Sequence, residues 1–114
     1  LPQVRLFAVQ PASNPTICSY FEHNFRHESK NLCDALTVKH TPLKKPLIEA
    51  IIKSRGSGLV ISNQEITSAS SFLSRHQLNV SLEGALALAG YLRAAQTGLD
   101  VGNFPVILIT GQKR

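Results

Sequence analysis

The pattern of hydrophobic and polar residues alternates along the chain between two kinds of segment. Short apolar runs with few polar interruptions are typical of buried strands in a parallel sheet. Such runs occupy residues 4–9, 35–38, 59–61 and 106–109. The segments between them carry apolar residues three and four positions apart, which predicts helices. We therefore expect an α/β fold, a three-layer sandwich with a mainly parallel sheet and helices on both faces.

The first predicted helix begins at Asn14, which can cap it, and Pro15, which suits its first position. Apolar residues follow at helical spacing: Ile17, Tyr20, Phe21 and Phe25. On this helix His23 and His27 lie four residues apart, the spacing of a metal-binding pair. Glu22 precedes the first histidine, however, so the metalloprotease pattern is not met. We expect two ordinary surface histidines and no metal site.

Three more helices are predicted downstream. The first begins between Pro42 and Pro46 and ends at Gly56. The second follows Ser62-Asn63-Gln64-Glu65, which has the form of a capping box, and continues to about His76. The third spans residues 82–97 and consists mainly of Ala, Leu and Gly, with almost no polar side chain before Arg93. A helix of such small apolar residues should be buried on most sides.

This third helix leads the chain to the apolar run 106–109, which is followed by Thr110 and Gly111. In open α/β sheets, ligands bind just outside the carboxyl ends of the strands. Thr110 can donate or accept a hydrogen bond at that position, beside a glycine that permits close approach. It is the first candidate functional residue. The alternative is that Thr110 only ends a strand.

Length and composition restrict the class of protein. A chain of 114 residues with 43% hydrophobic residues is at most one globular domain. Its apolar runs are too short to span a bilayer, and no signal peptide is recognisable. Cys18 and Cys33 do not form a disulfide framework, although one disulfide would be compatible with them. We expect a cytoplasmic protein without a membrane partner.

The net charge of +5 raises the question of nucleic-acid binding. The basic residues are scattered, and the only cluster combines Lys39-His40 with Lys44-Lys45. Because no aromatic residues alternate with that cluster to stack on bases, we expect no nucleic-acid partner.

Catalytic motifs are scarce. The chain has no Gly-x-Ser-x-Gly elbow, no paired-cysteine metal motif and no Gly-x-Gly-x-x-Gly. The turn at residues 56–58 lacks the Lys-Ser/Thr ending of a phosphate-binding loop. Cys18 or Cys33 could act as a nucleophile beside a histidine, but their spacing does not support it. The chain contains no methionine and opens on Leu1, so we expect part of a longer polypeptide.

Several stretches resemble a known family. Residues 60–66, 84–92 and 106–111, together with Gly98, look like the C-terminal part of a threonine synthase-like enzyme. These enzymes use pyridoxal 5'-phosphate (PLP) and have fold type II. Near the N-terminus, residues 8–11 with Asn14-Pro15 and Phe21 are similar to a strand and helix of the same family. The resemblance implies that residues 1–114 form one domain, the C-terminal portion of the large domain of such an enzyme.

The resemblance also implies a site and a reaction. Thr110 would hydrogen-bond the pyridine nitrogen of PLP, with Gly111 beside it. The Schiff-base lysine and the Gly-rich phosphate loop would lie upstream, so no catalytic residue is expected here and the isolated segment should be inactive. The whole enzyme, expected as a homodimer with an amino-acid substrate, would convert O-phosphohomoserine and water to threonine and phosphate.

Alternatives remain within and outside this class. Threonine and serine dehydratases share the small-residue helix, but they usually end the last strand in Ser-Gly-Gly where this chain has Thr110-Gly111. A dehydratase metal site would need a glutamate where this chain has Gln10, so no divalent metal is predicted. Relatives often have Glu-Pro before the small residues of the helix, which leaves the role of Glu83 open. The third interpretation of the sequence is a non-catalytic α/β binding module.

Overall fold

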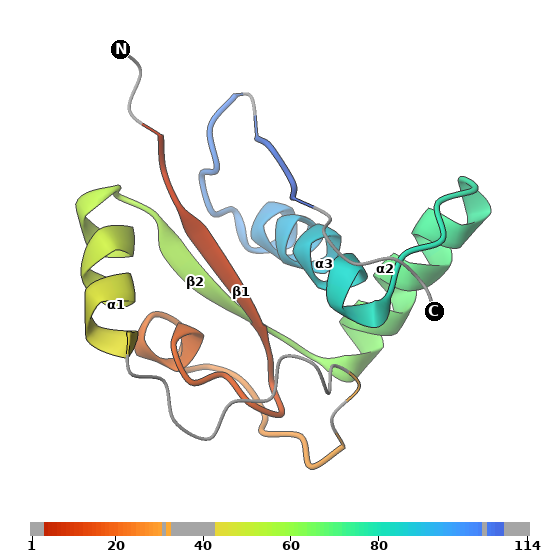
Figure 1. Ribbon diagram of the computed structural model, residues 1–114, viewed down its shortest axis with the longest axis horizontal. Coiled ribbons are helices and arrows are strands. Elements are labelled where there is room, and N and C mark those ends of the chain that lie inside the picture. Colours follow the sequence, from red (N-terminus) through yellow and green to blue (C-terminus); the bar gives the residue numbers. More distant parts are fainter. Residues whose placement is uncertain (1–3, 31, 33–42, 104, 109–114) are drawn as a thin grey trace.

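The computed structural model describes residues 4–30, 32, 43–103 and 105–108, and it has a small α/β architecture (Figure 1). Its elements in chain order are strand β1 (Phe7–Pro11), the 3-10 helix η1 (Cys18–Tyr20), helix α1 (Lys44–Lys53), strand β2 (Ser57–Ile61), helix α2 (Asn63–Arg75) and helix α3 (Leu82–Thr97). The two strands form a parallel sheet. The predicted strand at residues 35–38 lies outside the described residues.

The parallel register pairs Phe7 with Ser57 and Pro11 with Ile61. β1 therefore begins and ends later than the predicted run 4–9. The strand includes Gln10 and Pro11, and Pro11 is compatible with a strand end, where no ladder N–H is required. The pairing continues to Ala12, whose N–H donates to the carbonyl of Ile61 at 2.8 Å.

β2 is buried because its alternating side chains enter two apolar clusters. Leu59 and Ile61 pack with apolar residues of α2 and α3. Val60 packs on the other side with Ala12 and Cys18. α1 also packs on β2 and lies across the sheet from α2 and α3 in Figure 1. Burial of successive side chains explains why the run 59–61 shows no alternation of polar and apolar residues.

The connection from α1 to β2 depends on Ser54 and Gly56. The Ser54 hydroxyl donates to the carbonyl of Ile51 at 2.7 Å and accepts the N–H of Leu6 at 2.9 Å. A Cβ on Gly56 would overlap the Leu6 carbonyl. Glycine is therefore required here by the approach of the chain before β1, whereas the left-handed residue at the end of α1 is Arg55, with a φ of 65°.

The capping signals of α2 and α3 act as the sequence predicts. Ser62 and Glu65 form the reciprocal capping box of α2. Ser81 caps α3, which ends at Gly98 with a left-handed φ of 76°. The close packing predicted for α3 is confirmed at Ala89 and Gly90, which are buried, and a Cβ on Gly90 would come within 2.5 Å of Val9 Cγ2.

The predicted helix from Asn14 to about Phe25 is wrong. Only the short η1 forms, and residues 22–30 have no regular secondary structure. The reason is competition from long-range contacts: the Glu22 carboxylate accepts the N–H of Val60 in β2. His23 and His27 consequently share no helix face, and both are exposed.

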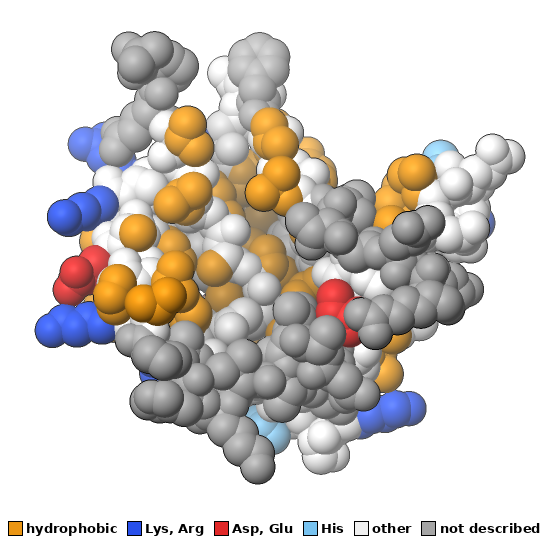
Figure 2. Space-filling model, viewed as in Figure 1, with side chains coloured by type: hydrophobic (Ala, Val, Ile, Leu, Met, Phe, Trp, Pro, Cys, Tyr) orange, Lys and Arg blue, Asp and Glu red, His pale blue; other side chains and the backbone are white. Residues whose placement is uncertain are grey.

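Residues 106–108 do not form the predicted buried strand in this structure. Val106 and Leu108 are 83% and 74% exposed, and residues 105–108 have no regular secondary structure. An apolar run indicates a central strand only if a sheet edge pairs with it, and none of the described strands does so. Figure 2 shows exposed apolar side chains on this segment and along α1.

Candidate functional site

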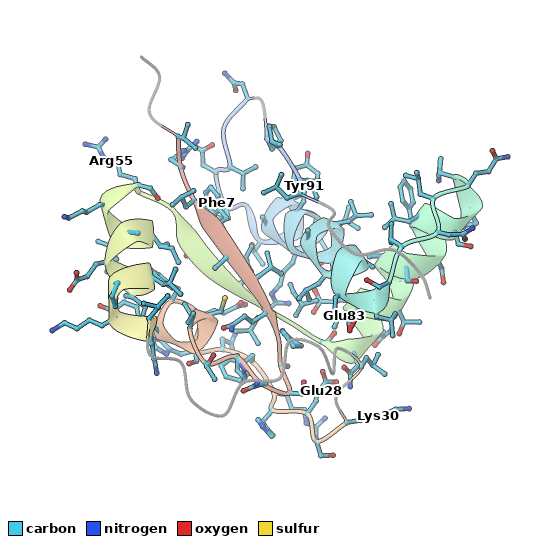
Figure 3. The ribbon with its side chains drawn as sticks, viewed as in Figure 1. Phe7, Glu28, Lys30, Arg55, Glu83 and Tyr91 are labelled. Carbon is cyan, nitrogen blue, oxygen red and sulfur yellow. The ribbon has the colours of Figure 1, made fainter. Side chains whose placement is uncertain are left out.

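The carboxyl ends of β1 and β2 lie at the same edge of the sheet, because the strands are parallel and in register. β1 leads there into Ala12, and β2 leads into Ser62 and the start of α2. Glu28 and Lys30 lie at the same edge, as labelled in Figure 3. By the general rule for open α/β sheets, this is where a ligand would bind.

The N-terminus of α2 opens onto this edge, but carboxylates of the chain itself occupy it. Glu28 Oε1 accepts the N–H of Asn63 at 2.7 Å, and Glu65 Oε1 accepts the N–H of Ser62 at 3.0 Å. A helix N-terminus attracts anions through its free N–H groups and its dipole. Since two carboxylates already use these donors, α2 does not provide a cradle for a phosphate group.

Asn63 is the unusual polar residue of this edge, and it is not among the functional residues predicted from the sequence. Its Nδ2 donates to the carbonyl of Lys30 at 2.8 Å. Its Oδ1 is buried without a hydrogen-bond partner, the only such side-chain atom in the described part of the chain. Its place directly after β2 and the capping serine was the only sequence signal for it.

Behind the edge, three charged side chains from distant segments form one network. Arg93 of α3 binds Glu22 through Nε at 2.9 Å and Nη2 at 2.5 Å. Arg93 Nη1 lies 3.3 Å from both carboxylate oxygens of Glu65. The hydrogen bond to Glu22 is the main factor that raises the pKa of Arg93. The network pairs both carboxylates with one guanidinium, and it connects α3 to the start of α2 and to the loop after η1. Its role is therefore structural.

Gln10 has a structural function of the same kind. Its Oε1 accepts the N–H of Ile17 at 2.7 Å and of Cys18 at 2.8 Å, and its Nε2 donates to Thr16 Oγ1 at 3.2 Å. The amide thereby holds η1 against the end of β1. Among the described residues, no three His, Cys, Asp or Glu side chains are grouped as metal ligands.

Cys18 is buried beneath β2 and does not have the properties of a nucleophile. Burial raises the pKa of its thiol from 9.0 to about 12. The reactive species of cysteine is the thiolate, which is scarce at neutral pH when the pKa is this high. Cys33 lies outside the described residues.

The residues predicted to contact the cofactor, Thr110 and Gly111, also lie outside the described residues, as do Lys39 and His40 of the predicted basic cluster. Glu83 lies in the first turn of α3 (Figure 3). A carboxylate there interacts favourably with the helix dipole. The structure thus brings Asn63, Glu28 and Lys30 to the sheet edge that the sequence analysis had assigned to Thr110.

Comparison with protein-family models, with curated proteins and with solved structures found no match. Among the described residues, no helix combines the length and apolar character needed to cross a membrane.

Proposed function

We propose that the chain is part of a PLP-dependent threonine synthase-like enzyme, whose substrate is a small amino acid. The observation that carries the proposal is the small-residue block 84–92, which supplies the strongest part of the resemblance. This block lies in α3, where Gly84, Ala85, Ala89 and Gly90 are buried. The parallel strands beneath α3 end at one edge, and a sheet edge of this kind is a common ligand site in α/β enzymes.

In the proposed enzyme, Thr110 would hydrogen-bond the pyridine nitrogen of PLP and Gly111 would give the cofactor room. Bound PLP acts as an electron sink for reactions of amino acids. A neutral hydroxyl at the pyridine nitrogen leaves that nitrogen largely unprotonated, which moderates the sink and favours elimination and replacement chemistry. The occupied N-terminus of α2 agrees with a phosphate loop contributed by another part of the enzyme.

The proposal includes the finer architecture. The large domain would be a three-layer sandwich in which the two described strands belong to a wider, mainly parallel sheet. α1 and the pair α2–α3 would then belong to the two outer layers. The complete enzyme would be a cytoplasmic homodimer, and residues 1–114 alone would be inactive because the Schiff-base lysine is contributed from elsewhere.

The test uses the complete protein in which this chain occurs. It should bind PLP with a visible absorbance band, and it should release phosphate and threonine from O-phosphohomoserine. Formation of a 2-oxo acid and ammonia from threonine or serine, without phosphate release, would identify a dehydratase instead. A complete protein that binds no PLP would contradict the proposal and favour the non-catalytic module.

A further inference from the structure

The two outer edges of the sheet differ in their hydrogen bonding. Successive residues of a strand direct their backbone groups to opposite sides, and the N–H of Ala12 donates to the carbonyl of Ile61. Val60, next to Ile61, therefore directs its N–H away from β1. That N–H donates to Glu22 Oε2 at 2.5 Å. The outer edge of β2 is thus blocked by a carboxylate that Arg93 holds in place.

Among the described residues, no side-chain hydrogen bond comparable to that of Glu22 covers the outer edge of β1. The same alternation directs the N–H and C=O groups of Phe7 and Val9 away from β2. No described strand pairs with this edge, since the described sheet contains only β1 and β2. An open edge of an apolar strand is a template for another extended segment.

A segment of the chain itself begins at the amino end of this edge. Arg5, two residues before β1, donates from Nη1 to the carbonyl of Asp100 at 3.2 Å, and its Nη2 lies 3.5 Å from Asp100 Oδ1. Asp100 Oδ1 also accepts the N–H of Gly102 at 2.9 Å. The pKa of Asp100 is lowered, mainly by the hydrogen bond from the Gly102 N–H and to a smaller extent by Arg5. These contacts fix the loop after α3 beside the start of β1.

From this loop, residues 105–108 run in the same direction as β1 in the view of Figure 1. Gly102 lies against the tip of the Arg5 side chain, since a Cβ on Gly102 would be 2.9 Å from Arg5 Nη2. Strands rise by about 3.3 Å per residue, so residues 105–108 in extended form are long enough to pair with most of the five-residue β1. The segment therefore has the direction and length to cover the open edge, and it carries the exposed Val106 and Leu108.

We propose that the outer edge of β1 is the docking surface for residues 105–108, which close onto it as a third parallel strand. The open arrangement described above is then one of two states. Closure would bury apolar side chains that are exposed here and pair the outward groups of Phe7 and Val9. This inference does not depend on PLP, but it deepens the architecture of the proposed function and rests on its wider parallel sheet; failure of strand pairing is measured separately from failure to bind PLP.

The test is amide hydrogen exchange on the whole chain at several protein concentrations. Closure predicts protection of alternate amides within residues 106–108 together with those of Phe7 and Val9, independent of concentration. Asp100→Ala, which releases the anchor, should lower this protection by roughly fivefold to tenfold, the effect of about one hydrogen bond. Glu49→Ala, an exposed carboxylate on α1, is the matched control and should leave it unchanged.

A second pair of variants tests the strand pairing directly. In a strand, Val106 and Ile107 direct their N–H groups to opposite sides, so only one of them can donate to β1. Val106→Pro and Ile107→Pro should therefore differ, and only one should strongly reduce the protection of Phe7 and Val9. Both positions are free of strand contacts in the open state, so neither substitution should unfold the domain.

Three results would overturn the proposal. Protection of Phe7 and Val9 that rises with protein concentration would show that a second copy occupies the edge. Protection of β1 without protection of residues 106–108 would assign the edge to another segment. Rapid exchange at both places in the whole chain would show that the edge stays open.

Discussion

Arg93 and Glu22 lie 71 residues apart in the sequence, yet their ion pair is shorter than the one that Arg93 forms with Glu65. Their side chains are 22% and 16% exposed. Because the second oxygen of Glu22 accepts the N–H of Val60, the pair connects α3 to the outer edge of β2. A single ion pair therefore ties together the loop after η1, the sheet and the last helix.

Arg93→Ala should destabilise the fold, because it leaves the mostly buried Glu22 carboxylate without its charged partner. An unpaired group of this kind costs about 1–3 kcal/mol in the free energy of unfolding. The measurement is urea denaturation. In the double variant with Glu22→Gln, the cost of Arg93→Ala should be smaller. Equal costs with either residue at position 22 would show that the pair does not contribute to stability.

Gly90→Ala should destabilise the packing of α3 on the sheet, since the added Cβ would meet Val9 Cγ2 at 2.5 Å. Alanine normally stabilises a helix relative to glycine, so a loss of stability here isolates the steric effect. Overpacking of this kind costs roughly 1–3 kcal/mol. In a Val9→Ala background the cost should largely disappear. A Gly90→Ala variant more stable than the parent would show that α3 is not in close contact with β1.

Cys18 should make stability fall at alkaline pH. The unfolded thiol has a pKa near 9.0 and the folded thiol one of about 12. Between these values the folded state binds more protons, so the free energy of unfolding decreases as the pH rises. Below about pH 9 the thiol is protonated in both states and its contribution is constant. The measurement is the denaturant midpoint as a function of pH.

Cys18→Ala is the control for this alkaline effect, because it removes the thiol and keeps a small apolar side chain in the cluster. The parent should lose more stability than this variant above about pH 9. A thiol reagent applied to a Cys33→Ser background should label Cys18 only after denaturation. Fast labelling of the native protein, or identical pH profiles for the two proteins, would contradict the burial of the thiol.

The sequence was most informative where structure depends on neighbouring residues. The capping box of Ser62 and Glu65 predicted the start of α2, and the small residues predicted the close packing of α3. The segment after Asn14 failed because its structure is set at long range, by the contacts of Glu22 with Val60 and Arg93. No local periodicity reveals that a glutamate will bind a strand edge far away in the sequence.

The same distinction applies to the candidate site. The predicted parallel sheet implies that a ligand would bind at the carboxyl ends of the strands. The structure has two such parallel strands. The partners at that edge could not be predicted. Glu28 and Lys30 reach Asn63 only because the loop after η1 turns back across the sheet. Thr110 remains a prediction from the sequence, since it lies outside the described residues.

Thr110→Val tests that prediction within the complete protein in which this chain occurs. Valine keeps the shape of the side chain and removes the hydroxyl, so the pyridine nitrogen of PLP would lose its hydrogen-bond partner. Loss of a buried partner costs about 1–3 kcal/mol. PLP affinity should therefore fall by roughly tenfold, and turnover should decrease with it. The measurements are cofactor titration by absorbance and the rate of phosphate release from O-phosphohomoserine.

Thr110→Ser is the matched control, because it retains the hydroxyl and removes only a methyl group. It should bind PLP and turn over substrate nearly as the parent does, with both variants folded by circular dichroism. A Thr110→Val enzyme that equals the parent in affinity and rate would reduce Thr110 to the end of an apolar segment. The proposed PLP chemistry would then need another residue at the pyridine nitrogen, and the similarity of Thr110-Gly111 to the synthase pattern would carry no functional meaning.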